Sequence, residues 1–299
     1  MKVEVLDYKN IKPAEENLSI CLGYFDGVHL GHAKIFNSCR QDSSFKTAVM
    51  TFDKPVSSLL DNDKSKEVIT SLDDRFRMIN RFQIDYYYII KIDQEFLDLS
   101  PEEFISNILD KLNVKEVFCG TDYTFGKYGK GTPKLLKKHY KVHSIELLDI
   151  DNQKVSTRNI ISLIKEGSVK EASRLMGHNY QMCGVVVHGH NRGESIGYPT
   201  ENVKLSSNYV IPRYGVYKTI AYISGVPHLA IANVGVHPTV GEEMEPIVEV
   251  HIPNYVSDDY GKTIYVEFLE FVRPERKFDS LEALKAQITS DILSLNNLL

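Results

Sequence analysis

Two histidines with two residues between them carry the clearest chemical signal in this chain. His29 and His32 lie within a glycine-rich run, residues 23–35 (GYFDGVHLGHAKI), that follows an apolar stretch and leads into an amphipathic one. That order is typical of a buried strand, a turn and a helix. Glycines let the backbone turn sharply and approach a ligand closely. Because the first N–H groups of a helix are available to anions, imidazoles at this position favour a polyphosphate ligand.

The elements that must position this pair are short strands that alternate with helices over residues 1 to about 150. The clearest helix begins at Ser100, a fitting N-cap, with Pro101 at its first position and Glu103 completing a capping box. Such alternation predicts a mostly parallel sheet covered on both faces, whose ligands bind beyond the carboxyl ends of the strands. The predicted strands are 20–23, 48–52, 86–92, 117–120 and 142–147.

The second half of the chain has a different pattern. Its apolar segments are separated by glycine, proline and asparagine clusters without a convincing helix, which predicts an antiparallel barrel. A terminal helix follows, with Asp279 and Glu282 as its expected capping box. Short helices broken at Gly167 are expected over 158–176. We therefore predict two domains, residues 1–180 and 181–299, and barrel strands at 184–188, 216–223, 229–234, 247–252 and 263–272.

Composition limits the class of protein. The 299 residues are 42% hydrophobic and 25% charged, as in soluble globular proteins, and the net charge of −5 gives no basic bias toward nucleic acid or anionic lipid. No apolar run approaches the 18 residues of a membrane span, and the N-terminus lacks the apolar core of a signal peptide. The four cysteines show no metal-ligand spacing. A cytoplasmic enzyme without nucleic-acid or membrane partners is the expectation.

Residues 23–32 resemble the His-x-Gly-His signature of nucleotidylyltransferases, which have a Rossmann-like fold. The longer form, GYFDGVHLGH, is similar to that of the enzymes that make FAD from FMN and ATP. A surface histidine pair on an ordinary turn is the alternative, and a zinc site is disfavoured because no third and fourth ligands lie nearby. The resemblance implies that His29 and His32 are catalytic and contact the triphosphate, and that the nucleotide pocket is shaped by Gly23, Tyr24, Phe25, Asp26, Gly27 and Gly31.

Two later segments extend this resemblance. Residues 120–127 (GTDYTFGK) are similar to the family's flavin-facing loop, which implies that Asp122 and Phe125 bind flavin. Residues 155–160 (VSTRNI) resemble its Ser-Ser-Thr-x-x-Arg element, which implies nucleotide binding by Ser156, Thr157 and Arg158. This chain departs from the element at Val155 and Ile160, and Arg158 falls about 200° around a helix from the usual arginine.

The second half resembles the riboflavin kinase family in residues 197–202 (GYPTEN), 233–239 (NVGVHPT) and 248–251 (VEVH). The resemblance implies that Glu249 is the base that takes the proton of the riboflavin 5′-hydroxyl. It implies Mg²⁺ ligands at Thr200 and Asn202, whose hard oxygens suit that ion. It further implies nucleotide contacts at Gly189 and Gly197 and a flavin contact at Arg273. Glu194 and Glu201 depart from the family pattern.

Nearly the whole chain is thus identified as a member of the bacterial bifunctional riboflavin kinase/FAD synthetase family. The resemblance implies phosphorylation of riboflavin to FMN and adenylylation of FMN to FAD, each with ATP and Mg²⁺, with pyrophosphate released in the second reaction. Departures in both halves leave open a paralogue with a single activity. A flavin-binding regulator without turnover is the alternative from another class, since fold alone does not decide function.

Overall fold

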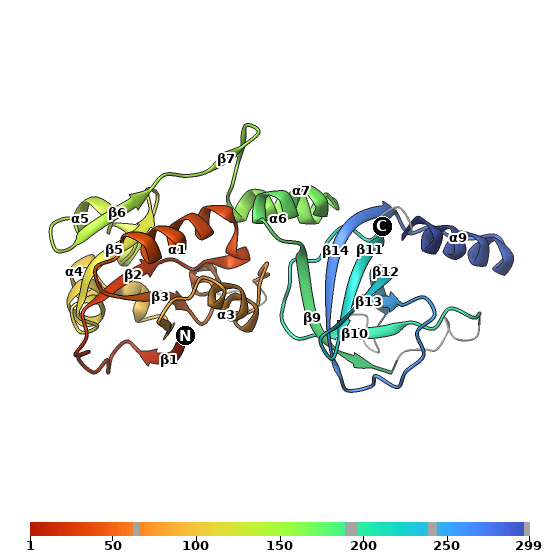
Figure 1. Ribbon diagram of the computed structural model, residues 1–299, viewed down its shortest axis with the longest axis horizontal. Helices are drawn as coiled ribbons and strands as arrows, with labels where there is room; N and C mark the ends of the chain where they lie inside the picture. Colours follow the sequence, from red (N-terminus) through yellow and green to blue (C-terminus); the bar gives the residue numbers. More distant parts are fainter. Residues whose placement is uncertain (62–65, 189–195, 239–243, 296–299) are drawn as a thin grey trace. The chain divides into compact units, whose positions relative to one another are not determined.

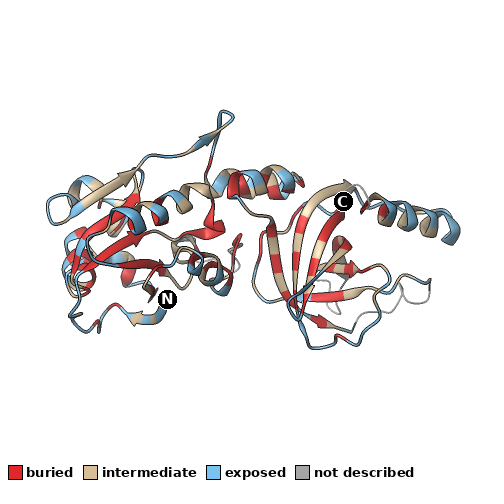
Figure 2. Ribbon diagram, in the orientation of Figure 1, coloured by how far each residue is buried: buried red, intermediate tan, exposed pale blue. Residues whose placement is uncertain are grey.

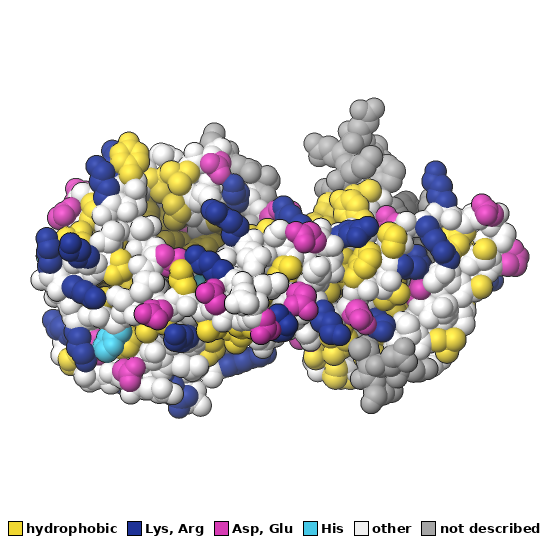
Figure 3. All heavy atoms as spheres, turned by 90° about the horizontal axis from the view of Figure 1, so that it is seen from above, with side chains coloured by type: hydrophobic (Ala, Val, Ile, Leu, Met, Phe, Trp, Pro, Cys, Tyr) yellow, Lys and Arg dark blue, Asp and Glu magenta, His cyan; other side chains and the backbone are white. Residues whose placement is uncertain are grey.

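The computed structural model describes residues 1–61, 66–188, 196–238 and 244–295, which form two compact units, Met1–Thr157 and Arg158–Leu299 (Figure 1). Each unit has its own sheet and core. Basic and acidic side chains are interspersed on the face shown in Figure 3. Among the described residues, the helices are too short or too polar to cross a membrane.

The first unit is built on a six-stranded parallel sheet with the order β1-β4-β3-β2-β5-β6, which confirms the predicted architecture. The five predicted strands are present. The edge strand β1 is not among the predicted ones, because its alternation of charged and apolar residues leaves Val3 and Val5 exposed. The strands are β1 Lys2–Asp7, β2 Leu18–Leu22, β3 Lys46–Phe52, β4 Tyr86–Lys91, β5 Val114–Gly120 and β6 Lys141–Ile145.

Both faces of this sheet are covered, as the continuous apolar strands require. All five residues of β2 are buried, with Ile20 and Leu22 in one core cluster and Cys21 in the other (Figure 2). The helices and minor elements of this unit are η1 Asp26–Val28, α1 Leu30–Asp42, α2 Val56–Leu60, α3 Leu72–Asn80, η2 Phe96–Asp98, α4 Pro101–Phe104, η3 Ile105–Leu109, η4 Lys127–Gly129, α5 Pro133–Leu136, β7 Asp149–Ile150 and β8 Gln153–Lys154.

The predicted helix start at Ser100 is confirmed. Ser100 Oγ accepts from the backbone N–H of Glu103, and the Glu103 carboxylate accepts from the backbone N–H of Ser100 at 2.8 Å. After one α-helical turn the chain continues as the π-helical segment η3. The capping box therefore fixes where the helix begins, while packing in the core determines its later winding.

A buried carboxylate ties the strands of this sheet together. Glu116 on β5 is 2% exposed and accepts hydrogen bonds from Ser19 Oγ, from the backbone N–H and Oγ of Ser44, and from Lys141 Nζ at 2.7 Å. Burial alone would raise the pKa of Glu116. The bonds from Lys141, Ser19 and Ser44 outweigh it and lower the pKa from the ordinary 4.5 to about 2.

We expect Glu116→Gln to lower the free energy of unfolding by about 3 kcal/mol at neutral pH. A depressed carboxylate pKa contributes stability above the unfolded pKa of 4.5, and this contribution is lost as the pH falls toward 2. Urea denaturation at a series of pH values should therefore show the variant converging on the wild type below pH 4.5. The exposed Glu102→Gln is the control. A difference that does not change with pH would contradict this account of Glu116.

The second unit is a closed antiparallel barrel with the order β10-β13-β12-β11-β14-β9, as predicted. The short strand β10 is not among the predicted ones, because its residues follow a turn directly. Two helices precede the barrel and are separated at Gly167, which has a φ of 84°. The elements are α6 Thr157–Glu166, α7 Val169–Met176, β9 Tyr180–Val187, β10 Glu201–Leu205, β11 Gly215–Ile223, β12 Val226–Pro238, β13 Met244–His251, β14 Thr263–Arg273 and α9 Leu281–Leu293.

The boundary between the compact units follows Thr157, the first residue of α6, whereas the sequence places the domain boundary at residue 180. Helix α7 packs on β9 and β14, which accounts for its clustering with the barrel. The N-cap of α9 is Ser280, whose Oγ accepts from the backbone N–H of Ala283 at 3.1 Å. The predicted capping box of Asp279 and Glu282 is therefore wrong by one position.

Candidate functional site

The loop between β2 and α1 holds the histidine pair in a tightly constrained backbone. Phe25 and Gly27 have φ values of 58° and 75°, and Val28 has a φ of 39°. A Cβ at Gly23 would lie 2.7 Å from the Phe25 ring, so glycine is required for this approach. The loop lies at the carboxyl end of β2, where ligands of parallel sheets bind.

His29 and His32 are brought together at the first turn of α1. His29 is the N-cap, and its Nδ1 accepts from the backbone N–H of His32 at 3.3 Å. Because an accepting nitrogen carries no proton, neutral His29 has its proton on Nε2. The two rings stack with centroids 3.5 Å apart and planes 17° apart. A Cβ at Gly31 would lie 3.1 Å from the His29 ring, which explains the small residue between the histidines.

The electrostatic surroundings keep His32 uncharged. Burial, then the neighbouring His29 and Arg75, lower the pKa of His32 well below its ordinary value of 6.5. His32 is therefore a neutral hydrogen-bonding group at pH 7. Its Nδ1 is buried and has no hydrogen-bond partner within the part of the chain that the structure describes. The Phe25 ring meets the His32 ring edge-on at 5.2 Å.

Asp26 fixes the loop from inside. Its carboxylate accepts from the backbone N–H of Ile69 at 3.0 Å and from the N–H and Oγ1 of Thr70, each at 2.8 Å. Thr70 Oγ1 in turn accepts from the N–H of Gly27 at 2.9 Å. Burial raises the pKa of Asp26, and these bonds act in the opposite direction. The geometry gives Asp26 a supporting position beneath the loop.

The hydroxyl-rich segment lies against the same loop. Thr157 Oγ1 donates to the carbonyl of Asp26 at 3.4 Å, and Val155 is buried close to Gly31. Ser156 lies between them in the chain, whereas the Arg158 side chain is exposed at the start of α6. Ile160, at the position of the family's arginine, is fully buried.

The predicted flavin-facing residues of this unit differ in exposure. Asp122 is exposed after β5. Phe125 is buried in the core, with its ring 5.1 Å from the Phe104 ring and 5.9 Å from the Tyr123 ring. Their roles in flavin binding stay predictions.

Arg75 on α3 is the residue of this site that sequence reasoning missed. Its guanidinium is buried, and Nη1 donates to the carbonyl of Tyr24 at 2.8 Å and to Thr51 Oγ1 at 2.9 Å. The available signal was its position three residues after Leu72 and four before Ile79, on the apolar face of an amphipathic helix. A basic residue on such a face must find polar partners in the fold.

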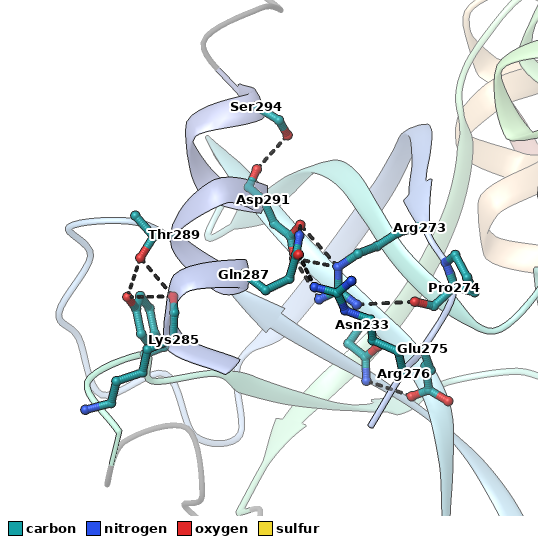
Figure 4. Close-up of polar contacts among 11 residues, drawn as sticks. Asn233, Arg273, Pro274, Glu275, Arg276, Lys285, Gln287, Thr289, Asp291 and Ser294 are labelled. Carbon is teal, nitrogen blue, oxygen red and sulfur yellow. Dashed lines mark hydrogen bonds and ion pairs between the residues drawn. The ribbon is translucent and has the colours of Figure 1, made fainter. Parts of the chain in front are cut away.

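In the second unit, barrel register places three polar residues side by side. Glu249 on β13 pairs directly with Asn202 on β10 and with Asn233 on β12. Residues directly opposite in antiparallel strands project from the same face. The predicted base and one predicted metal ligand are therefore neighbours. Asn233, which was not among the predicted site residues, donates from Nδ2 to Glu275 Oε1 at 3.2 Å (Figure 4).

A cavity of about 320 Å³ opens beside the predicted metal ligands and is lined by Thr200. Asn202 donates from Nδ2 to the carbonyl of Thr200 at 3.4 Å, which leaves its amide oxygen to accept. Glu201 also lines the cavity, and burial followed by Asp259 and Asp258 raises its pKa. Gly197 stands in a turn with a φ of 90°. The predicted nucleotide contact Gly189 and the departure Glu194 lie outside the described residues.

Arg273 is held by the terminal helix. Figure 4 shows its guanidinium directed at Asp291, to which Nε and Nη2 donate at 3.0 and 2.7 Å. Gln287 Nε2 donates to the same carboxylate at 2.7 Å. Asp291 is 3% exposed, so this ion pair anchors α9 to β14. The predicted contact of Arg273 with flavin stays a prediction.

The first unit is a parallel α/β fold whose histidine pair opens a helix. The second unit is a barrel that presents a carboxylate beside an amide. Together they fit an ATP-dependent transferase with two sites. Comparisons identify the family. Residues 11–163 match the FAD synthetase family model and residues 176–299 match that of riboflavin kinase.

Curated relatives match nearly the whole chain. The bifunctional riboflavin kinase/FMN adenylyltransferase of Bacillus subtilis is 36% identical, covering 94% of this chain and 92% of the relative. The enzyme with the same description from Listeria monocytogenes is 35% identical, covering 92% of this chain and 90% of the relative. That from Escherichia coli K12 is 31% identical, covering 94% of this chain and 92% of the relative. A crystal structure described as that of a macrolide-efflux protein from Streptococcus pneumoniae has a TM-score of 0.91 and 31% identity over 99% of both chains.

The chain therefore belongs to the family of bifunctional riboflavin kinase/FMN adenylyltransferases. It has a riboflavin kinase domain and an FAD synthetase domain, and its reactions form FMN and FAD from riboflavin with ATP. The predicted family, fold class and enzyme class are confirmed.

Proposed function

We propose that His29 and His32 bind the triphosphate of ATP while the first unit aligns the FMN phosphate for attack on the α-phosphorus. The observation that carries this assignment is the stack of the two imidazoles at the first turn of α1. The attacking phosphate forms the new P–O bond as pyrophosphate leaves, so no protein nucleophile is required. The site has to align the reactants and stabilise charge on the phosphates.

The local geometry suits that task. The Nε2–H of His29 and the first N–H groups of α1 are donors for phosphate oxygens. Neutral His32 adds an imidazole that does not repel His29. Room for the ligand is left by three glycines, Gly23, Gly27 and Gly31. The loop is maintained by Tyr24, Phe25 and Asp26. The nucleotide site is completed by Ser156, Thr157 and Arg158.

For the kinase reaction, we propose that Glu249 takes the proton of the riboflavin 5′-hydroxyl as that oxygen attacks the γ-phosphorus of ATP. The neighbouring Asn202 and Thr200 offer an amide oxygen and a hydroxyl, a fitting donor set for Mg²⁺. When bound, the ion would neutralise phosphate charge during transfer. Arg273, Asp122 and Phe125 are the proposed flavin contacts.

The two activities are proposed to divide at residues 180 and 181. The family models support this division, because one ends at residue 163 and the other begins at residue 176. Helix α7, which lies close to this division, packs on β9 and β14 of the barrel. We further propose a cytoplasmic location, where ATP and flavins are available.

The deciding assay incubates purified protein with riboflavin, ATP and Mg²⁺ and separates the flavins by chromatography. FMN followed by FAD is the expected result. FMN without FAD would show that the changes at Val155 and Ile160 have disabled the adenylyltransferase. FAD only from supplied FMN would assign the loss to the barrel. Flavin binding without ATP consumption would support a regulator instead.

A further inference from the structure

Arg75 combines deep burial with an unusual set of partners. It is 1% exposed, and its guanidinium lies 4.2 Å above the ring of Tyr24. Nη1 donates to the Tyr24 carbonyl and to Thr51 Oγ1, while Thr51 Oγ1 itself donates to the same carbonyl at 2.8 Å. These bonds connect Arg75 to Tyr24, which follows β2, and to Thr51, near the end of β3. They hold Tyr24 in place directly before Phe25, whose φ is positive.

The charge of Arg75 has no ion-pair partner among the described residues. Asp74, next to it on α3, instead pairs with Arg77. Asp26, whose field reaches Arg75, is engaged by Ile69 and Thr70. A buried cation without a carboxylate is costly, and the cation–π contact with Tyr24 offsets only part of that cost.

Arg273, a half-buried basic residue that is held by α9, shows the contrast. Arg273 is neutralised by Asp291 through three hydrogen bonds. Within the described ranges, the Arg75 guanidinium donates to neutral oxygens of Tyr24 and Thr51, and its Nε is buried without a partner. A positive charge left uncompensated behind an anion site favours the arrival of a polyphosphate.

We propose that Arg75 is a positioning residue for adenylyl transfer: its guanidinium clamps Tyr24 at the base of the histidine loop and supplies a permanent positive charge behind the triphosphate site. The proposal rests on the assignment of His29 and His32 to that site. The groups that act on His32 are its stacked neighbour His29 from the same helix and Arg75 from α3, with Asp26 close to Arg75.

The test compares Arg75→Met, Arg75→Lys and Thr51→Val in the full chain. Each variant is measured for KM and kcat in FAD formation from FMN and ATP, and His32 is titrated by NMR. We expect Arg75→Met to raise the KM for ATP about tenfold and to move the His32 midpoint toward its ordinary value, because a repelling charge is gone. Thermal unfolding followed by circular dichroism reports whether the first unit, which contains Arg75, is folded, and riboflavin phosphorylation reports the same for the barrel.

The two other variants separate charge from clamping. Arg75→Lys should keep the wild-type His32 midpoint and KM while losing part of kcat, because an ammonium lacks the planar fork. Thr51→Val weakens the clamp without removing charge, so kcat should fall with the midpoint unchanged. An unchanged KM and midpoint in Arg75→Met would overturn the proposal. Should Arg75→Met not fold, Arg75→Gln takes its place in the test. Equal KM values for Arg75→Gln and Arg75→Lys would then overturn the proposal.

These outcomes are distinct from failure of the site assignment. If His29→Ala and His32→Ala form FAD normally, the assignment of the triphosphate site is wrong. If those variants are inactive while Arg75→Met keeps its KM and His32 midpoint, only the role of Arg75 is wrong.

Discussion

Replacing His29 or His32 by alanine is expected to lower FAD formation by about 10²–10³-fold while riboflavin phosphorylation continues at the wild-type rate. In the proposed site, each imidazole stabilises the charge that develops on the triphosphate. The loss should appear in kcat with FMN and ATP, and it should persist at saturating ATP. FAD formation at the wild-type rate in both variants would contradict the role assigned to the pair.

The two histidines need different controls. His29 also caps α1, so its removal costs about 1 kcal/mol of helix stability apart from any effect on catalysis. His29→Ser restores a good N-cap but not the imidazole, and it should remain as inactive as His29→Ala. Recovery of FAD formation in His29→Ser would show that capping, not phosphate binding, is the function of His29.

The second large effect is expected at Glu249. Glu249→Gln should slow FMN formation from riboflavin by about 10²–10⁴-fold, because the amide cannot take the hydroxyl proton. FAD formation from supplied FMN should be unchanged, which shows that the first unit is intact, and thermal unfolding followed by circular dichroism is the control for folding of the barrel. Glu282→Gln, at an exposed position in the first turn of α9, is the matched substitution. A fully active kinase in Glu249→Gln would exclude Glu249 as the base.

Local sequence determines the parts of this protein that the pattern predicts well. The strand–loop–helix around His29 is contiguous, so periodicity and glycine spacing are enough to place it. The capping box at Ser100 is likewise local. The short strand β10 and the edge strand β1 were missed, because short or half-exposed strands lack a clear apolar alternation.

The remaining site features depend on contacts between distant segments. Asn233 meets Glu249 only through the register of β12 on β13, which no local pattern encodes. Arg75 reaches Tyr24 across 51 residues, and its burial follows from how α3 packs on the sheet. Ser280 and Asp279 are both residue types that favour the N-cap, so residue type alone does not distinguish them, and the structure has Ser280 in that position.

The positive φ values of Phe25 and Val28 have a thermodynamic meaning for substrate binding. A branched or bulky residue with a positive φ is strained by about 1–3 kcal/mol. Here the favourable free energy of folding of the first unit offsets that strain. Under the proposed assignment of the triphosphate site, ATP would meet a loop that folding has already ordered, so binding would lose little affinity to ordering it. Preorganisation of this kind exchanges a fraction of the first unit's stability for nucleotide affinity, so selection for heat resistance at this loop would act against selection for tight ATP binding.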